Sequence, residues 1–281
     1  MHSGENYIPD FNFIDYALCP YPIDFLDRSC YCPVCMGDDV RMRNLTNKNR
    51  DYDESIFKDK IYFANFIASH ESEYNIRGDF FKKLCEYKRV ESPGTYLNNM
   101  HDLKVVSNSD GSKTDFQHKC KFTLCFESTK HEGFVTEKIT DAFYSDTIPI
   151  YYGSSTVVNI FNPNAFINCS DYPSFDAVIE KIIELDQNDK KYLEMLRQPI
   201  FIDPKFADKI LNNVEQFIVD IFDQPIEKAY RRSKVYSAKR HEDFIKRTYA
   251  MSKNTKLRWI YAFKKVVDRC LSLLKKNKAA F

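Results

Sequence analysis

The triplet Thr136-Glu137-Lys138 places a carboxylate and an ammonium group together at the beginning of an amphipathic segment. The apolar positions of this segment recur at helical spacing, as Ile139, Ala142 and Phe143. The free N–H groups and the macrodipole of a helix N-terminus attract anions, and Lys138 adds a full positive charge. The triplet therefore predicts an anion-binding site. The alternative is an exposed helix start that carries ordinary surface charges.

Two short apolar runs flank this segment. Residues 121–126 alternate and end apolar, as a strand of a sheet does, and residues 148–152 form a second run that Gly153 closes. Together the three segments predict a strand–loop–helix–strand unit, whose loop and helix start lie at the carboxyl edge of a parallel sheet. Open α/β sheets bind their ligands at this edge.

The same alternation extends from residue 61 to residue 227, which predicts a parallel sheet covered by helices. We expect strands at 61–69, 104–106, 122–126, 148–152 and 166–168. We expect helices at 77–88, 136–145, 156–161, 175–186 and 189–197. Residues 1–60 contain four prolines and no sustained periodicity, so they are expected to be irregular.

Three motifs follow one another around the predicted anion site: Phe126-Glu127-Ser128, Phe134-Val135-Thr136-Glu137-Lys138 and Ile148-Pro149-Ile150-Tyr151-Tyr152-Gly153. In this order they resemble the donor-binding motif of the bacterial-type α1,3/α1,4-fucosyltransferases. Other segments of the same family domain are resembled by residues 161–167 and by residues 66–69 together with Ile76-Arg77. The segment that carries the family's proposed catalytic base is resembled by Ser3-Gly4-Glu5-Asn6. The resemblance covers residues 3–200 with a gap at 28–58.

The resemblance implies an α/β fold of the GT-B type with two Rossmann-like domains and a helical basic tail. Residues 1–60 would be a remnant of the N-terminal, acceptor-side domain, and residues 61–227 a complete nucleotide-sugar donor domain. Residues 228–281 would form the tail. Relative to the family, the chain begins about half a domain late. The upstream part was lost, is encoded separately, or is missing because the sequence is a fragment.

The resemblance also assigns roles to single residues. Lys138 and Arg77 would neutralise the donor diphosphate, Arg77 through a bidentate guanidinium fork, and Glu137 would accept hydrogen bonds from the ribose hydroxyls. Ser128 stands where the family has asparagine and Phe134 where tyrosine is common, and both are expected to contact the donor. Glu5 would be the general base. The alternative for Glu5 is an unstructured acid near the terminus.

The implied enzyme is an inverting, metal-independent transferase that moves L-fucose from GDP-fucose to a 3-hydroxyl of N-acetylglucosamine or glucose. Its partners would be this nucleotide-sugar donor and a lactosamine-type glycan acceptor, as in lipopolysaccharide synthesis, with no cofactor and no nucleic acid. Two alternatives stay open. The chain uses another nucleotide-sugar, or it is a truncated, non-catalytic remnant that only binds GDP-fucose.

Cysteines form a cluster near the start of the chain: Cys19, Cys30, Cys32 and Cys35. Four thiolates satisfy a structural zinc site, but the spacing lacks two separated C-x-x-C pairs, so structural or surface thiols are favoured. Nine cysteines, an odd number with no secretory signal ahead of them, indicate reduced thiols in a cytoplasmic setting.

The charge is unevenly divided along the chain. Residues 228–281 hold 17 Lys/Arg and 3 Asp/Glu, a net charge of +14, against −13 for residues 1–227. Apolar residues fall on one helical face of this tail, at Ile260, Phe263, Val267, Leu271 and Leu274. The pattern predicts peripheral attachment to the anionic inner face of a membrane, with the body of the protein in the cytoplasm. The alternative is a helix that packs on the protein.

Overall fold

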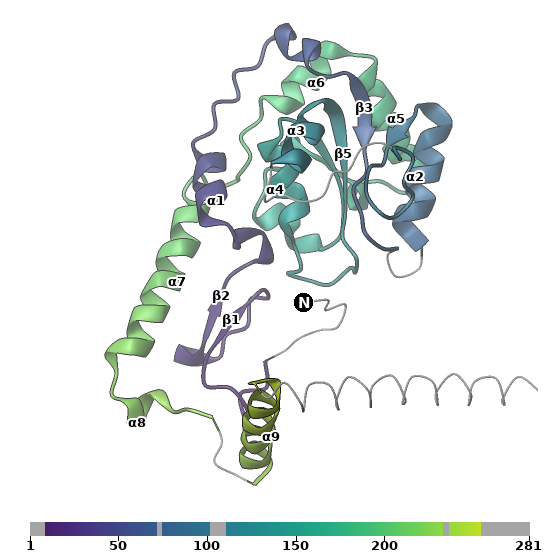
Figure 1. Ribbon diagram of the computed structural model, residues 1–281. Helices are drawn as coiled ribbons and strands as arrows, with labels where there is room; N and C mark the ends of the chain where they lie inside the picture. The colour runs from purple at the N-terminus through teal and green to yellow at the C-terminus, as the bar shows by residue number, and fades with distance from the viewer. Residues whose placement is uncertain (1–8, 72–74, 102–110, 233–235, 254–281) are drawn as a thin grey trace, which may run out of the picture. The chain divides into compact units, whose positions relative to one another are not determined.

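The computed structural model describes residues 9–71, 75–101, 111–232 and 236–253 (Figure 1). Within these ranges the chain forms two compact units. The larger unit runs from Ala17 to Asp223, and the smaller one joins Pro9–Tyr16 to the chain after Gln224. The domain boundaries expected from the sequence, after residues 60 and 227, stay predictions.

A five-stranded, wholly parallel sheet forms the centre of the larger unit. In order across the sheet, the strands are β4 (Val90–Glu91), β3 (Tyr62–Asn65), β5 (Cys120–Phe126), β6 (Ile148–Tyr152) and β7 (Ile167–Asn168). The central strand β5 is the longest and is paired along its length with β6. Parallel strands need crossover connections, which explains why helices lie between them in the sequence.

Helices cover both faces of this sheet (Figure 1). One face packs against α2 (Ile76–Tyr87), α5 (Phe175–Asp186) and α6 (Asp189–Leu196). The other face packs against α1 (Asp39–Thr46), α4 (Glu137–Tyr144) and α7 (Phe206–Asp223). The short helix α3 (Ser112–His118) precedes β5 and lies beside α4.

Strand β5 contributes side chains to the hydrophobic cores on both faces of the sheet. Phe122, Leu124 and Phe126 point into the core under α2, α5 and α6, whereas Cys125 belongs to the core under α4. Side chains of a strand alternate between the two faces, so a strand that is covered on both sides is apolar throughout. Lys121 and Thr123 are the polar exceptions, and the Thr123 hydroxyl accepts a hydrogen bond of 2.8 Å from Asn65 Nδ2.

Most of the predicted elements of the sheet domain are confirmed, with different ends. The helix at 175–186 and the strand at 148–152 have the predicted bounds. The strand predicted at 61–69 ends at Asn65, because the apolar residues after it leave the sheet as a loop. Residues 155–159 form a 3₁₀ helix where an α-helix was expected. The strand predicted at 104–106 lies outside the described residues.

The expectation that residues 1–60 are irregular is wrong for part of them. Strands β1 (Ala17–Cys19) and β2 (Ser29–Tyr31) pair in parallel, and α1 follows. Each strand has three residues, too few for alternation to be visible in the sequence. Met42 and Leu45 of α1 are buried in the core beneath α4, so this segment is part of the larger unit.

The smaller unit contains α8 (Ile226–Ala229) and α9 (Tyr236–Lys253). Asp15 ties its two segments together, since one carboxylate oxygen accepts hydrogen bonds from Arg231 N at 2.8 Å and Arg232 N at 2.9 Å. The apolar tail face predicted at residues 260–274 lies outside the described residues. None of the helices in the described part of the chain is long and apolar enough to cross a membrane.

Candidate functional site

The order of the strands creates a gap between two diverging loops. After β3 the chain turns outward to β4, and it later returns on the other side of β3 to form β5. The loops that leave the carboxyl ends of β3 and β5 therefore run in opposite directions. Ligands of open α/β sheets bind in the crevice at such a switch point. Both segments predicted to bind an anion lie here, because α2 follows the first loop and α4 follows the second.

Glu127 is the first residue after β5, and its carboxylate is completely buried. It accepts hydrogen bonds from Thr136 N at 2.8 Å and from Thr136 Oγ1, which is 2.9 Å from Oε1 and 2.8 Å from Oε2. Lys138 Nζ donates to the same carboxylate, 2.8 Å from Oε2, and also lies 2.8 Å from Thr136 Oγ1. We call these three residues the Glu127 cluster. Glu127 belongs to the motif Phe126-Glu127-Ser128, but its position in the sequence predicts no role for it.

Gly153 makes room for this cluster. A Cβ added at Gly153 would lie 2.6 Å from Glu127 Cγ and 2.5 Å from the Tyr151 hydroxyl oxygen. Any larger residue at this position would therefore displace the buried carboxylate.

The N-terminus of α4 lacks its usual side-chain cap. Thr136 occupies the N-cap position, but its hydroxyl is engaged with Glu127 and makes no capping hydrogen bond to the helix. An uncapped first turn presents backbone N–H groups, which suits an anionic ligand. Lys138, in this same turn, is only partly exposed, and although burial lowers its pKa, the charges of Glu127 and Glu137 raise it overall. Lys138 is therefore a cation at neutral pH.

Arg77, in the first turn of α2, is the second cation at the switch point. It is buried, its Nη2 donates to the backbone oxygen of His70, and its Nε lies 3.9 Å from Glu71 Oε1. Burial lowers the pKa of Arg77, while the charges of Glu71 and Glu127 oppose this effect. Arg77 and Lys138 thus lie at the same, carboxyl edge of the sheet, and the charge of Glu127 acts on both. Their roles toward a ligand stay predictions.

Glu137 is exposed at the first position of α4. Although the residue as a whole is exposed, its carboxyl group is partly desolvated by the surrounding protein, which raises its pKa. The charge of Lys138 and a backbone hydrogen bond lower the pKa by a larger amount, so the net shift is downward. Lys113 of α3 contributes to the same lowering. Glu137 is therefore an ionised hydrogen-bond acceptor, as a partner for hydroxyl groups must be.

The remaining predicted site residues differ in their placement. Ser128 is exposed and Phe134 is half-buried, both on the loop between β5 and α4. Gly133 fixes this loop, since its N–H donates to Ser154 Oγ at 2.9 Å and Thr156 Oγ1 at 3.1 Å. Glu5 lies outside the described residues.

A buried ion-pair network on α4 was missed by the sequence analysis. The Asp141 side chain has no exposed surface and binds both Arg41 of α1 and Lys113 of α3, the latter with a separation of 2.6 Å between Nζ and Oδ2. Asp141 lies one turn after Lys138, so the network fixes the helix that carries the anion site. An acidic residue amid buried helix positions was the only signal of it in the sequence.

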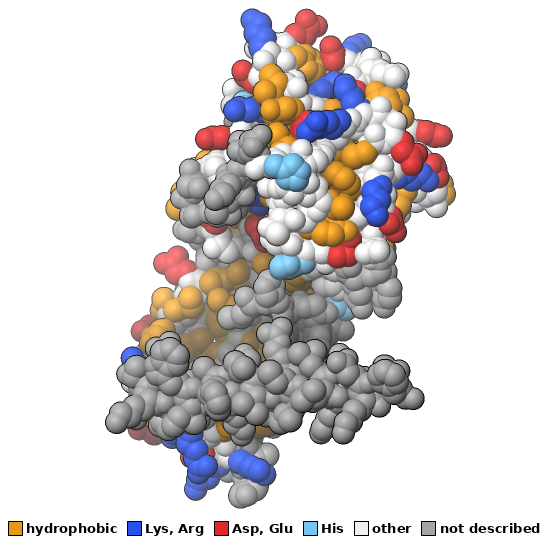
Figure 2. Space-filling model, turned by 45° about the vertical axis from the view of Figure 1, so that its right-hand side comes forward, with side chains coloured by type: hydrophobic (Ala, Val, Ile, Leu, Met, Phe, Trp, Pro, Cys, Tyr) orange, Lys and Arg blue, Asp and Glu red, His pale blue; other side chains and the backbone are white. Residues whose placement is uncertain are grey.

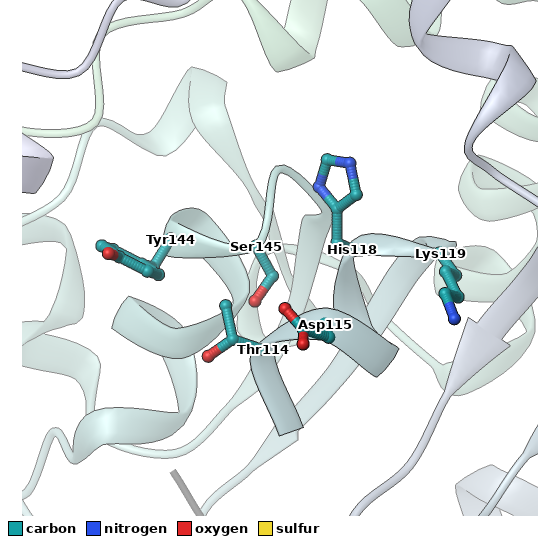
Figure 3. Close-up of a pocket in the computed structure, with 6 residues that line it drawn as sticks. All are labelled: Thr114, Asp115, His118, Lys119, Tyr144 and Ser145. Carbon is teal, nitrogen blue, oxygen red and sulfur yellow. The ribbon is translucent and has the colours of Figure 1, made fainter. Parts of the chain in front are cut away.

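A pocket of about 430 Å³ opens at the opposite, amino-terminal edge of the sheet (Figure 3). It is lined by Thr114, Asp115, His118, Lys119, Tyr144 and Ser145. The ends of α3 and α4 form its walls, and helix C-termini repel anions. The pocket is therefore a poor site for a diphosphate, in contrast to the switch point.

Buried lysines satisfy the carbonyl groups of these helix ends. Lys48 Nζ donates to Tyr144 O at 2.6 Å, and Lys60 Nζ donates to His118 O at 2.5 Å. Burial lowers the pKa of Lys60 to about 8, although the charge of Asp146 opposes this effect. Lys60 is thus expected to titrate far below an exposed lysine.

The low pKa of Lys60 has a measurable effect on stability. The unfolded chain binds this proton up to pH ~10.4 and the folded chain only up to about 8, so the free energy of unfolding should rise between these values. Urea unfolding at a series of pH values measures it. The rise should be smaller in Lys60→Met and unchanged in the exposed control Lys190→Met. Equal slopes in wild type and Lys60→Met would contradict the assignment.

The cysteine cluster shows no arrangement for a metal. Among the described residues, no group of three or more His, Cys, Asp or Glu side chains is placed to bind an ion. Cys19 and Cys35 are buried, and burial raises the pKa of both thiols. Raised values favour the protonated thiol over the thiolate that zinc binds.

Charges on the outer surface are intermixed. In the upper part of the space-filling view, basic and acidic side chains alternate with apolar ones over the larger unit (Figure 2). In this upper part of the view, the described side chains form no concentrated patch of one sign. The cations of the anion site are instead partly buried, where their interactions are less screened.

Known proteins resemble this chain in sequence. The family profile described as glycosyltransferase family 10 (fucosyltransferase), C-terminal part, matches residues 57–199. The α-(1,3)-fucosyltransferase FucT of Helicobacter pylori is 33% identical over 226 residues, which are 70% of this chain and 46% of that protein. The human 4-galactosyl-N-acetylglucosaminide 3-α-L-fucosyltransferase 9 is 30% identical over 134 residues, 46% of this chain and 34% of the relative. The chain thus spans less than half the length of these relatives.

A solved structure resembles it as well. The crystal structure of an α1,3-fucosyltransferase with GDP-fucose matches with a TM-score of 0.62 and 30% sequence identity, over 77% of this chain and 73% of that one. The family profile begins just before β3 and ends just after α6, so it contains the whole sheet and both helices of the switch point. This chain belongs to glycosyltransferase family 10, the fucosyltransferases.

Proposed function

We propose that this chain is an inverting α1,3-fucosyltransferase that binds GDP-fucose at the switch point of its sheet. The observation that carries the proposal is that Arg77, at the start of α2, and Lys138, at the start of α4, lie at the switch-point edge of the sheet within a family 10 domain. Two cations and an uncapped helix start suit a diphosphate, and Glu137 beside them suits the ribose hydroxyls. The match to a structure with GDP-fucose supports this donor.

The proposed reaction is a single displacement. An acceptor hydroxyl attacks the anomeric carbon of fucose, the new C–O bond forms, and the bond from carbon to the diphosphate breaks. The hydroxyl proton passes to the carboxylate of Glu5, and GDP leaves with the bonding electrons. Lys138 and Arg77 stabilise the charge that develops on the departing phosphate, so the scheme needs no metal and no cofactor.

Ser128 and Phe134 are proposed to touch the donor from the loop between β5 and α4. The serine offers one hydroxyl where the family has an amide, and the phenylalanine offers a ring without a phenolic hydroxyl. Each difference is expected to weaken donor binding by ~1 kcal/mol without changing the reaction.

The proposed acceptor is N-acetylglucosamine or glucose in a lactosamine-type glycan. The names of the relatives support it, because both state a 3-linked fucosyl transfer and the human one names a galactosyl-N-acetylglucosaminide. We also propose a GT-B arrangement, in which residues 61–227 hold the donor and residues 1–60 belong to the acceptor side.

Transfer from a panel of labelled nucleotide-sugars to N-acetyllactosamine tests the proposal. We expect turnover of GDP-fucose alone, and the same rate with an excess of EDTA. Turnover of a UDP-sugar but not of GDP-fucose would overturn the donor assignment.

A second candidate is a non-catalytic protein that binds GDP-fucose at the same switch point. Calorimetry with GDP beside the transfer assay separates the two. GDP binding without transfer, not restored by an upstream fragment of a relative, would favour this candidate.

We further propose that the basic tail holds the protein at the anionic inner face of a membrane. Each basic residue near such a surface contributes ~1 kcal/mol, and salt screens the attraction. Full-length protein should pellet with vesicles that contain phosphatidylserine, less so as salt rises, and truncation after about residue 227, which removes the whole tail, should release it. Neutral phosphatidylcholine vesicles are the control. Equal pelleting of both forms would mean that the tail packs on its own protein.

A further inference from the structure

The carboxylate of Glu127 lies where an isolated charge is unfavourable. Its side chain has no exposed surface, and Val135 and Tyr151, which belong to the core beneath α4, are buried completely. A buried carboxylate costs several kcal/mol unless hydrogen bonds and a cation compensate it. The Glu127 cluster supplies both, through Thr136 and Lys138.

The same contacts determine how Lys138 is held. A lysine ammonium has three N–H donors, and two of them are directed at Glu127 Oε2 and Thr136 Oγ1. These two contacts leave one donor for a ligand at the partly exposed end of the side chain. A flexible lysine is thereby fixed in one orientation at the anion site.

We propose that Glu127 is a positioning residue for fucosyl transfer, which fixes the Lys138 ammonium through a hydrogen-bonded ion pair and directs its remaining N–H group toward the donor phosphate. This inference rests on the proposed function. Glu127 itself does not touch substrate, because its carboxylate is fully buried and its acceptor positions are used within the protein. It acts through Lys138 alone.

The charge of Glu127 has a separate consequence for Lys138. Burial lowers the pKa of this lysine, and Glu127 is the strongest of the groups that raise it. Without the carboxylate, the charge of Glu137 still raises the pKa of Lys138, but burial and the charge of Arg77 lower it, so this pKa should fall. The alkaline limit of transfer should then move to lower pH.

Glu127→Gln tests this, since glutamine keeps the size and one acceptor oxygen but removes the charge. We expect kcat to fall about tenfold with a smaller change in the KM for GDP-fucose, because the contact strengthens as the phosphate leaves. The alkaline limb of the kcat profile should move to lower pH, because the variant lacks the charge that raises the pKa of Lys138. A folded variant with the wild-type limb would overturn the proposal.

Two further variants separate positioning from folding. Asp186→Asn is the matched control, a buried carboxylate 2.9 Å from Lys121 Nζ at the other edge of the sheet, and it should leave kcat and the pH profile unchanged. Thr136→Val removes the hydroxyl between Glu127 and Lys138 but keeps the ion pair. It should lower kcat severalfold and leave the alkaline limb of the pH profile in place. If Glu127→Gln does not fold, Thr136→Val tests the positioning role in its place.

A measurement without catalysis keeps this inference apart from the proposed function. Trace acetylation with acetic anhydride modifies the neutral amine, so the yield at Lys138 against pH gives its pKa by mass spectrometry. A lower pKa in Glu127→Gln than in wild type supports the positioning role even if the chain transfers no fucose. An unchanged pKa refutes it even if wild type is fully active.

Discussion

Replacing Lys138 by alanine is expected to lower the rate of fucosyl transfer by at least ~10²-fold, since a charged contact to the leaving phosphate is lost. The effect should appear mainly in kcat, because charge on the phosphate grows as the bond to fucose breaks. Removal of the ammonium also leaves the buried carboxylate of Glu127 without its cation. Initial rates with GDP-fucose and N-acetyllactosamine, at saturating donor, measure this effect.

Related variants show whether the loss belongs to the site. Glu137→Ala should be similarly impaired, and Arg77→Lys should be poorly tolerated because an ammonium cannot replace the planar fork. Lys119→Ala, an exposed lysine at the opposite edge, is the control and should keep the wild-type rate. Near-normal rates in all three site variants would show that the donor binds elsewhere.

Asp141→Asn is expected to lower the free energy of unfolding by ~3–5 kcal/mol, since it removes one partner of a buried ionic network. The change leaves Arg41 and Lys113 facing each other, although their side chains are only 14% and 16% exposed. Asparagine has the same size, so the loss reports on charge and not on packing. Urea denaturation followed by circular dichroism measures the change.

An exposed ion pair provides the comparison. Asp176→Asn breaks a contact of 2.7 Å with Lys83, but the aspartate side chain is 66% exposed, and such pairs contribute less than ~1 kcal/mol. Equal destabilisation by the two substitutions would show that Asp141 is not the charge that binds α1 and α3 to α4.

The sheet domain was predictable because its strands are buried on both faces. The runs around Phe122 and Ile150 are mostly apolar, and α5 has a regular apolar face, so burial itself produced the signal. Strand β4 has only two residues and α3 is mostly polar, and neither length nor periodicity marks such elements. The carboxyl end of β3 was predicted at residue 69 but lies at Asn65, because the apolar loop that follows has the same composition as a strand.

The candidate site was predicted in its cations but not in their partners. Lys138 and Arg77 were identified from helix starts and from motifs. The contacts of Glu127, Asp141 and Glu71 depend on how β3, β5, α1 and α3 come together, which local sequence does not encode. The sequence shows that Glu127 and Asp141 are acidic residues next to apolar ones, but it does not show that Lys138 and Arg41 are their partners.

Pairing of β3 with β5 has a consequence for the order in which the protein folds. Asn65 Nδ2 bonds to Thr123 Oγ1 across 58 positions of sequence, whereas β5, α4 and β6 are neighbours along the chain. Local contacts form faster than distant ones, so the segment with Lys138 should assemble first and Arg77 should join it only after the long chain loop closes. A nucleotide that needs both cations would then bind only the completed domain. The rate at which GDP binding recovers during refolding would therefore report the rate at which β3 pairs with β5.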